Sequence, residues 1–133
     1  ARNENINKII KKNYKKKIIL IDRFIDSTIA YQHYGMGINY NLINSINKYL
    51  IKDINIDCIF LNTVSTKKLK IRLKKRRNLN KYDRFKLSFY KKVQKGFLKL
   101  SKNKKNYTII DSNKDINVNK KIILNKIDKL IFN

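Results

Sequence analysis

The chain lacks proline and tryptophan altogether, and it contains only three glycines and one cysteine. With Cys58 alone, no disulfide can form within the chain, and its place in an apolar run indicates a buried strand residue. None of the glycines precedes a Lys-Ser or Lys-Thr pair, so these residues include no glycine-rich phosphate loop. No apolar run approaches the roughly 20 residues that cross a bilayer, and we therefore expect no membrane partner.

Acidic residues are also scarce, since nine Asp and Glu stand against 33 Lys and Arg, which gives a net charge of +24. Such a charge is typical of proteins that bind nucleic acid or anionic membranes. The sequence is also dominated by isoleucine, asparagine and lysine, a composition that strong AT bias in the coding sequence produces. Because the hydrophobic content of 42% argues against disorder, we favour a folded domain with solvated surface lysines, and nucleic-acid binding is the less favoured alternative.

The hydrophobic pattern predicts strands that alternate with helices. Short β-branched runs predict buried strands at Ile18–Asp22, Asp57–Asn62 and Tyr107–Asp111. Amphipathic spacing predicts helices near 3–14, 26–34, 39–50, 65–73, 85–98 and 118–131. The apolar residues expected to face the core in the first, third and fifth helices are Ile6, Ile9, Ile10 and Tyr14, then Leu42, Ile43, Ile46, Tyr49 and Leu50, then Phe85, Phe89, Val93 and Phe97. This alternation implies a single α/β domain over residues 1–133, with a parallel sheet covered on both faces.

Polar and charged residues follow the first predicted strand. The strand stops at Asp22 and Arg23, and in open α/β sheets ligands bind beyond the carboxyl ends of the strands. The helix that follows can present four hydrogen-bonding groups on one face, from Ser27, Thr28, Tyr31 and Gln32. A fixed cation followed by neutral polar groups suits a ligand with one phosphate and one polar ring, which is a nucleotide.

These motifs resemble a known family. The sequence reads Asp22-Arg23-Phe24, Ser27-Thr28, Ala30-Tyr31-Gln32 and then Gly35 and Gly37, which resembles the Asp-Arg-aromatic, Ser-Thr, Ala-Tyr-Gln and glycine-loop motifs of thymidylate (dTMP) kinases. The likeness runs in order along the chain and includes Ala1-Arg2, the lid-like segment Arg76–Asp83, and the last predicted strand and helix.

The resemblance implies a fold. It is an α/β three-layer parallel sheet of the nucleoside-monophosphate-kinase (P-loop NTPase) type, seen without its first two strands. Members of the family begin with a strand, a phosphate loop, a helix and a second strand, so we expect this chain to be the C-terminal two-thirds or so of such a kinase. The phosphate-loop strand lies between Ile18–Asp22 and Cys58–Asn62 in the family's sheet. On their own, these residues would therefore leave sheet edges exposed, and we expect them to fold poorly and to lack activity.

The resemblance also implies a reaction, the Mg²⁺-dependent transfer of the ATP γ-phosphate to dTMP, giving dTDP. Arg23 would hold the acceptor phosphate and brace the transferring one, and Asp22 would orient Arg23 or reach the metal ion through water. The alternatives are an ion pair of Arg23 with Asp22 or Asp26, and Asp22 as a helix cap.

The nucleoside contacts implied by the resemblance come from Arg2, Ser27, Thr28, Tyr31 and Gln32. Arg2 would read the thymine carbonyl, and Thr28 or Gln32 would bond the thymine edge or an adjacent water. Tyr31 would pack beneath the sugar and exclude a ribose 2′-hydroxyl by bulk; its alternative is a half-buried core tyrosine. Ser27 has the alternative of a local helix bond.

The lid is expected at about 72–83, where the family often reads Arg-Gly-Glu-Leu-Asp-Arg-x-Glu and this chain reads Arg76-Arg77-Asn78-Leu79-Asn80-Lys81-Tyr82-Asp83. The cations expected to neutralise the ATP phosphates are Arg72, Arg76, Arg77 and Lys81; a solvated basic face is the alternative. His33 is interpreted as a surface histidine rather than a general base.

The resemblance also implies a cytoplasmic location. It implies a homodimer for the full-length form, and the helix near 3–14 could contribute to the dimer contact. The competing functions are a basic nucleic-acid-binding module and a decayed, non-catalytic kinase remnant.

Overall fold

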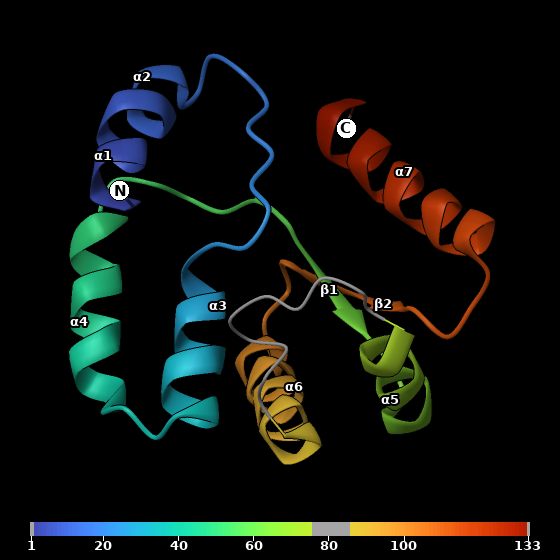
Figure 1. Cartoon of the computed structure of the whole chain (residues 1–133). Helices are drawn as coiled ribbons and strands as arrows, with labels where there is room; N and C mark the ends of the chain where they lie inside the picture. The colour runs from blue at the N-terminus through green and yellow to red at the C-terminus, as the bar shows by residue number, and fades with distance from the viewer. Residues whose placement is uncertain (1, 76–85, 133) are drawn as a thin grey trace.

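The computed structural model describes residues 2–75 and 86–132, apart from the side chains of Arg2 and Asn3. Within these ranges, helices surround a pair of strands (Figure 1). In chain order the elements are α1 (Arg2–Asn5), the π-helical η1 (Ile6–Ile10), α2 (Lys11–Asn13), α3 (Ile25–Thr28), the π-helical η2 (Ile29–Gly35), α4 (Tyr40–Leu50), β1 (Ile59–Thr63), α5 (Thr66–Lys75), α6 (Leu87–Ser101), β2 (Tyr107–Asp111) and α7 (Ile116–Phe132). In these ranges no helix has both the length and the apolar character that a membrane span would need.

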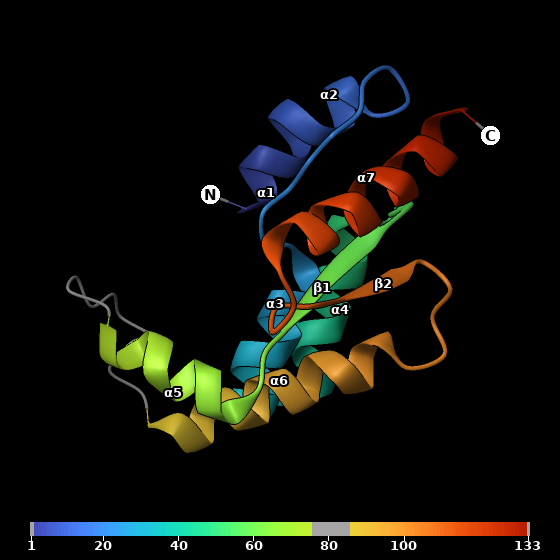
Figure 2. The ribbon, with the colours of Figure 1, turned by 90° about the vertical axis from the view of Figure 1, so that its right-hand side faces the viewer.

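The strands β1 and β2 lie side by side and run parallel, from Ile59 opposite Tyr107 to Thr63 opposite Asp111 (Figure 2). The chain between them crosses over through α5 and α6, as parallel pairing requires. Figures 1 and 2 place α6 on one side of the pair and α7 on the other, so the predicted α/β arrangement with helices on both faces is confirmed. The strand predicted at Tyr107–Asp111 has the predicted bounds, and the strand predicted at Asp57–Asn62 lies slightly later, at Ile59–Thr63.

The strand predicted at Ile18–Asp22 is wrong. In the part of the chain that the structure describes, the sheet consists of β1 and β2 alone, and residues 18–21 form an extended segment outside it. Ile18 is 69% exposed and Leu20 is 84% exposed. A strand exists through hydrogen bonds to a neighbouring strand, and no described residue supplies that neighbour here. The segment therefore keeps the apolar sequence of a buried strand without its pairing.

The main core joins η2 to α6. Its buried side chains are Ile29, Ala30, Ile43, Phe89, Val93 and Leu100. Two glycines permit the close approach of these helices: a Cβ atom at Gly35 would lie 2.5 Å from Phe89 Cε2, and one at Gly96 would lie 2.5 Å from Tyr34 Cδ2. Of the apolar stripe predicted for α6, Phe89 and Val93 are buried, and Phe97 packs against the cluster.

Other predicted core faces are only partly buried. Asn39 caps α4 by accepting from the Leu42 N–H at 3.1 Å, but only Ile43 of the apolar residues predicted to face the core from this helix is buried. Ile46 is 52% exposed and Tyr49 is 79% exposed, because none of the described elements covers the outer face of α4. In the first helix Ile6 and Ile10 are buried while Ile9 faces solvent, since the wider π-helical turn changes the residue spacing that the prediction assumed.

Substitution of Gly96 by Ala should destabilise the protein. Alanine in a helix normally gains about 1 kcal/mol over glycine. Here the new methyl group would overlap Tyr34, whose own Cβ would lie 2.7 Å away and cannot rotate aside. Overpacking of this kind costs about 1–3 kcal/mol and should outweigh the gain.

Urea unfolding followed by circular dichroism measures the difference, with Lys95→Ala, at a neighbouring exposed position of α6, as the matched control. A Gly96→Ala protein more stable than the unmodified one would contradict the packing described for η2 and α6.

Candidate functional site

The candidate site begins where the unpaired segment reaches Arg23. The backbone of Arg23 has φ +63°, in the left-handed region, which non-glycine residues rarely adopt. This conformation costs about 1–2 kcal/mol, so other contacts must hold it. The turn delivers the chain from Asp22, which is exposed, into α3, where it places Arg23 at the head of the helix.

The side chain of Arg23 lies on Tyr31. Its Nη2 donates to the Tyr31 hydroxyl, and its Cζ lies 4.7 Å from the Tyr31 ring centroid, which is a cation–π contact. The Tyr31 ring in turn makes edge-to-face contacts with Phe89 and Phe97 of α6, at centroid distances of 6.0 and 6.3 Å. Arg23 is therefore anchored through Tyr31 to α6, which has more buried residues than the other described helices. The alternative ion pairs of Arg23 with Asp22 or Asp26 are absent from these described side chains.

The first turn of α3 is tied to two distant elements. The Asn47 side chain, which is buried in α4, donates to the Ile25 carbonyl at 3.4 Å. The Tyr107 hydroxyl at the start of β2 donates to the Asp26 carboxylate. Burial, together with this hydrogen bond and the negative charge of Asp26, raises the pKa of Tyr107 well above its ordinary value. The turn that carries Arg23 is thus held by both α4 and β2.

The remaining nucleoside candidates lie along the same helix. Ser27 and Thr28 are half-buried in α3, and Gln32 is exposed in η2. The Ser27 N–H bonds the Phe24 carbonyl at 3.2 Å, which closes the first turn. Arg2 belongs to α1, and its side chain lies outside the described residues.

His33 makes local contacts after α3. It is half-buried, and its ring lies 4.7 Å from the Tyr34 ring and 5.4 Å from the Tyr40 ring. Its Nδ1 lies 2.8 Å from the Ile38 carbonyl oxygen, and a carbonyl can only accept, so Nδ1 carries a proton and donates. His33 therefore fastens the loop after η2.

A cavity of about 520 Å³ lies apart from Arg23, between the carboxyl ends of the strands and the helices α5 and α7. Its lining combines apolar and polar side chains, namely Asn62, Arg72, Ile110, Ser112, Lys114, Ile116, Asn119, Lys120, Ile123 and Leu124. Arg72 Nη2 donates to the Ser112 carbonyl at 3.0 Å, and Lys68 Nζ donates to the Asn113 carbonyl at 2.8 Å, so two cations of α5 hold the loop after β2.

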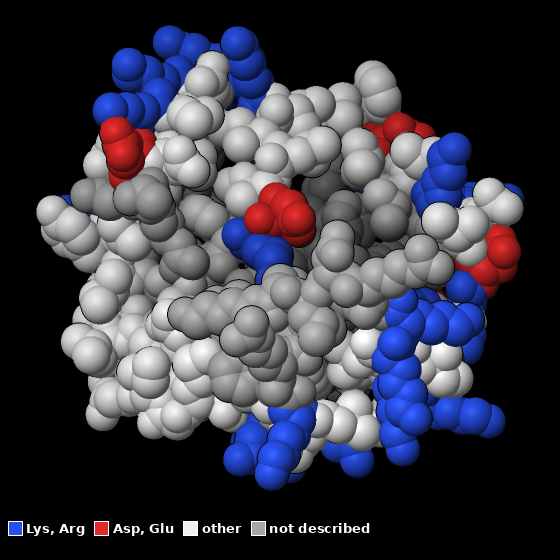
Figure 3. All heavy atoms as spheres, viewed as in Figure 1, with Lys and Arg blue, Asp and Glu red and all other residues white. Residues whose placement is uncertain are grey.

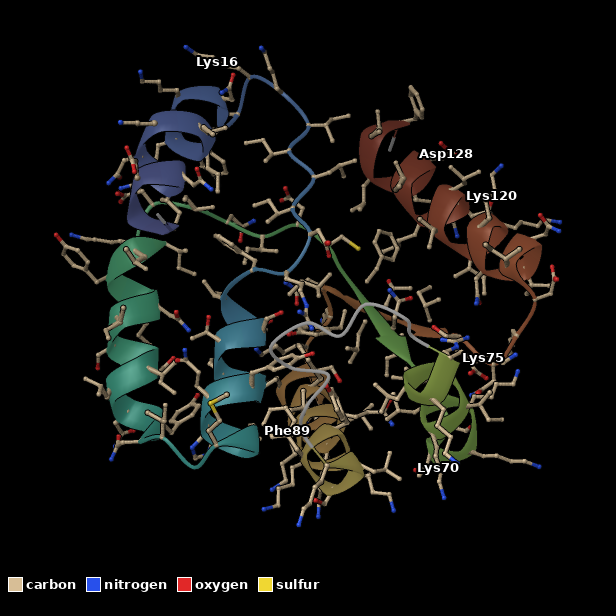
Figure 4. The ribbon with its side chains drawn as sticks, in the orientation of Figure 1. Lys16, Lys70, Lys75, Phe89, Lys120 and Asp128 are labelled. Atoms are coloured by element: carbon tan, nitrogen blue, oxygen red, sulfur yellow. The ribbon has the colours of Figure 1, made fainter. Side chains whose placement is uncertain are left out.

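The predicted lid is only partly described. Residues 72–75, which the prediction assigned to the lid, continue α5, which runs from Thr66 to Lys75. Arg76, Arg77 and Lys81 lie outside the described residues. Many of the other lysines are solvated: Lys16, Lys70 and Lys75 point away from the body of the molecule (Figure 4), and basic side chains gather over α2 and α5 (Figure 3).

The sequence did not reveal the roles of Asn47, Tyr107 and Asp26. A signal existed for Asn47, which follows Ile43 by one helical turn and so shares its buried face. A buried amide needs a partner, and the Ile25 carbonyl is that partner. No sequence signal links Tyr107 to Asp26, because they are 81 positions apart.

The raised pKa of Tyr107 predicts that its hydroxyl stays protonated where ordinary tyrosines ionise, near pH 10. The ultraviolet absorbance of tyrosinate, followed between about pH 9 and 11, measures this. The substitution Tyr107→Phe should leave the amplitude the same as in the unmodified protein, because the Tyr107 hydroxyl does not ionise in this range. A Tyr107→Phe protein whose amplitude falls by one tyrosine's share would show that the bond to Asp26 does not hold Tyr107.

Comparisons with known proteins agree on one family. The sequence model of the family described as thymidylate kinase matches residues 1–123. A thymidylate kinase of Wolbachia sp. subsp. Brugia malayi (strain TRS) is 42% identical over 103 residues, covering 77% of this chain and 48% of that protein. A thymidylate kinase of Mycoplasma capricolum subsp. capricolum is 36% identical over 135 aligned residues, covering 96% of this chain and 63% of that protein.

Solved structures show the same likeness. The crystal structure of thymidylate kinase from Ehrlichia chaffeensis matches with a TM-score of 0.70 at 32% sequence identity, covering 96% of this chain and 58% of that one. The chain thus spans between 48% and 63% of the length of these relatives. The fold is that of the nucleoside-monophosphate kinases, with two strands of the sheet present in the described residues. Because the family model covers most of its length, this chain belongs to the thymidylate kinase family.

Proposed function

We propose that the full-length protein is a kinase that transfers the γ-phosphate of ATP to dTMP and releases dTDP and ADP. The family of the chain supports a nucleotide kinase, and the relatives described above are thymidylate kinases. The observation that carries the proposal is the placement of Arg23 in a strained turn at the head of α3, with its guanidinium on Tyr31. In the sequence, Asp22-Arg23 resembles the Asp-Arg motif of the family.

Arg23 has the chemistry that phosphoryl transfer requires. The reaction needs in-line positioning and neutralisation of negative charge more than covalent help from protein groups. The planar guanidinium can bind two phosphate oxygens at once, and Tyr31 engages Nη2, so the other donors remain for the acceptor phosphate of dTMP and the transferring phosphate. Among the described ion pairs none joins Asp22 to Arg23, and we propose that Asp22 reaches the metal ion through water.

The nucleoside would lie along α3 and η2. Thr28 and Gln32 are proposed to bond the thymine edge or a water beside it, with Ser27 near them and Arg2 at the thymine carbonyl. Tyr31 would lie beneath the sugar and exclude a 2′-hydroxyl by bulk. Its packing on Phe89 and Phe97 supports this role, because a ring that is held in place cannot move aside for the larger ribose.

ATP would bind over the cavity between α5 and α7. The volume of the cavity falls in the range usual for ligand sites, its isoleucine and leucine side chains suit a planar base, and Arg72, Lys114 and Lys120 supply positive charge. Arg76, Arg77 and Lys81, in the lid proposed at 72–83, are further candidates for the ATP phosphates.

Mg²⁺ would reach the protein mainly through water and the nucleotide phosphates, as is usual for this ion. In the ranges 2–75 and 86–132 no three His, Cys, Asp or Glu side chains gather in a way that could hold a metal ion directly. The exposed carboxylate of Asp22 is compatible with an outer-shell contact. The ion would neutralise phosphate charge. The family resemblance also leads us to propose a cytoplasmic homodimer.

An assay of ADP release by the full-length protein tests the proposed reaction. We expect phosphorylation of dTMP with strong preference over UMP, because the bulk of Tyr31 admits a deoxyribose and rejects a ribose. Comparable rates with both nucleotides, or no turnover of dTMP, would contradict the proposal.

Substitution of Arg23 by Ala should lower kcat at least about a hundredfold, as expected when a preorganised group that stabilises transition-state charge is removed. Arg23→Lys should restore a small part of the activity, since lysine keeps the positive charge but cannot bind two phosphate oxygens at once as the planar guanidinium does. Lys12→Ala, which removes an exposed cation of α2, is the control and should change kcat less than about twofold. Circular dichroism checks that the variants remain folded. A folded Arg23→Ala enzyme of nearly normal kcat would exclude the role assigned to Arg23.

A further inference from the structure

The position of Arg23 is constrained by contacts that follow it in the chain. Only two residues separate Arg23 from Asp26, whose carboxylate receives the Tyr107 hydroxyl. The backbone at Arg23 is in the left-handed region, so the turn holds its shape only if neighbouring contacts fix it.

The bond between Tyr107 and Asp26 is suited to fix that turn. Both residues are half-buried, and a hydroxyl that donates to a carboxylate makes a short, directional and strong hydrogen bond. Tyr107 is the first residue of β2 and pairs with Ile59 of β1, so the donor belongs to the sheet. The Lys104 Nζ, in the loop before β2, lies 5.5 Å from the Tyr107 ring centroid, which is a cation–π contact.

The same bond leaves Arg23 available for a ligand. Asp26 lies three residues after Arg23, close enough in sequence for an ion pair that would hold the guanidinium and offset its charge. In the structure the Asp26 carboxylate is engaged by Tyr107, and the guanidinium of Arg23 lies on Tyr31. An anion bound at the head of α3 therefore meets a cation that no carboxylate neutralises among the described ion pairs.

We propose that Tyr107 and Asp26 are positioning residues for Arg23. Their hydrogen bond fastens the first turn of α3 to the start of β2, and this sets where the guanidinium meets the phosphate of the acceptor nucleotide. The inference rests on the proposed phosphorylation of dTMP. It adds two residues that touch neither nucleotide and act through Arg23.

A mutant cycle in the full-length protein tests the proposal. Tyr107→Phe and Asp26→Ala are each made in the unmodified protein and in the Arg23→Ala variant, with kcat, the KM for each substrate and the calorimetric Kd of dTMP as readouts. Each substitution should lower kcat/KM for dTMP about tenfold, since small displacements of a reacting group are costly, while the KM for ATP changes less than about twofold. In the Arg23→Ala background the same substitutions should change kcat/KM for dTMP, and the Kd of dTMP, less than about twofold, because the residue they position is gone.

Two further variants separate positioning from a general loss of structure. Asp26→Asn retains a carbonyl that can accept from Tyr107, so it should keep at least about half of the kcat/KM for dTMP. Tyr49→Phe, at an exposed tyrosine of α4, should be indistinguishable from the unmodified protein.

Equal effects with and without Arg23, effects below about twofold in the unmodified background, or an Asp26→Asn loss as large as that of Asp26→Ala would each overturn the proposal. An unmodified protein that neither binds nor phosphorylates dTMP would instead overturn the proposed function, and the same measurements separate these results.

Discussion

The contact between the guanidinium of Arg23 and the ring and hydroxyl of Tyr31 is the interaction on which the site depends. The backbone of Arg23 is in the left-handed region and its side chain is exposed, so the contact with Tyr31 fixes where the guanidinium lies. Tyr31 in turn packs on Phe89 and Phe97 of α6. An exposed cation is thereby held, through Tyr31, by a well-packed helix.

The close packing of η2 against α6 fixes the position of the Tyr31 ring. Gly35 and Gly96 let the two helices approach so closely that a methyl group at either position would overlap an aromatic ring. This explains two of the three glycines in a chain that otherwise avoids the residue. The start of α3 is held from other directions by Asn47 and Tyr107. The site thus draws on three elements: α4 and β2 hold the turn directly, and α6 holds the Tyr31 ring on which Arg23 lies.

The local sequence pattern was sufficient to predict the helices and the strand Tyr107–Asp111, because the spacing of apolar residues and the turn residues depend on neighbouring positions in the sequence. It failed for Ile18–Asp22, since pairing depends on a neighbouring strand that no described residue provides. It failed for Ile46 and Tyr49, since an apolar face is buried only where another element covers it. The bond from Tyr107 to Asp26 was beyond reach, because it joins residues that only the fold brings together. The functional roles of the candidate residues remain predictions.

The central claim is that Arg23, held on Tyr31, receives the phosphate of dTMP. A crystal structure of the full-length protein with dTMP tests it most directly. The account predicts that a phosphate oxygen of dTMP lies within hydrogen-bond distance of the Arg23 guanidinium while the ring of Tyr31 lies against the deoxyribose. A guanidinium turned toward solvent, with the phosphate bound at another position, would contradict it.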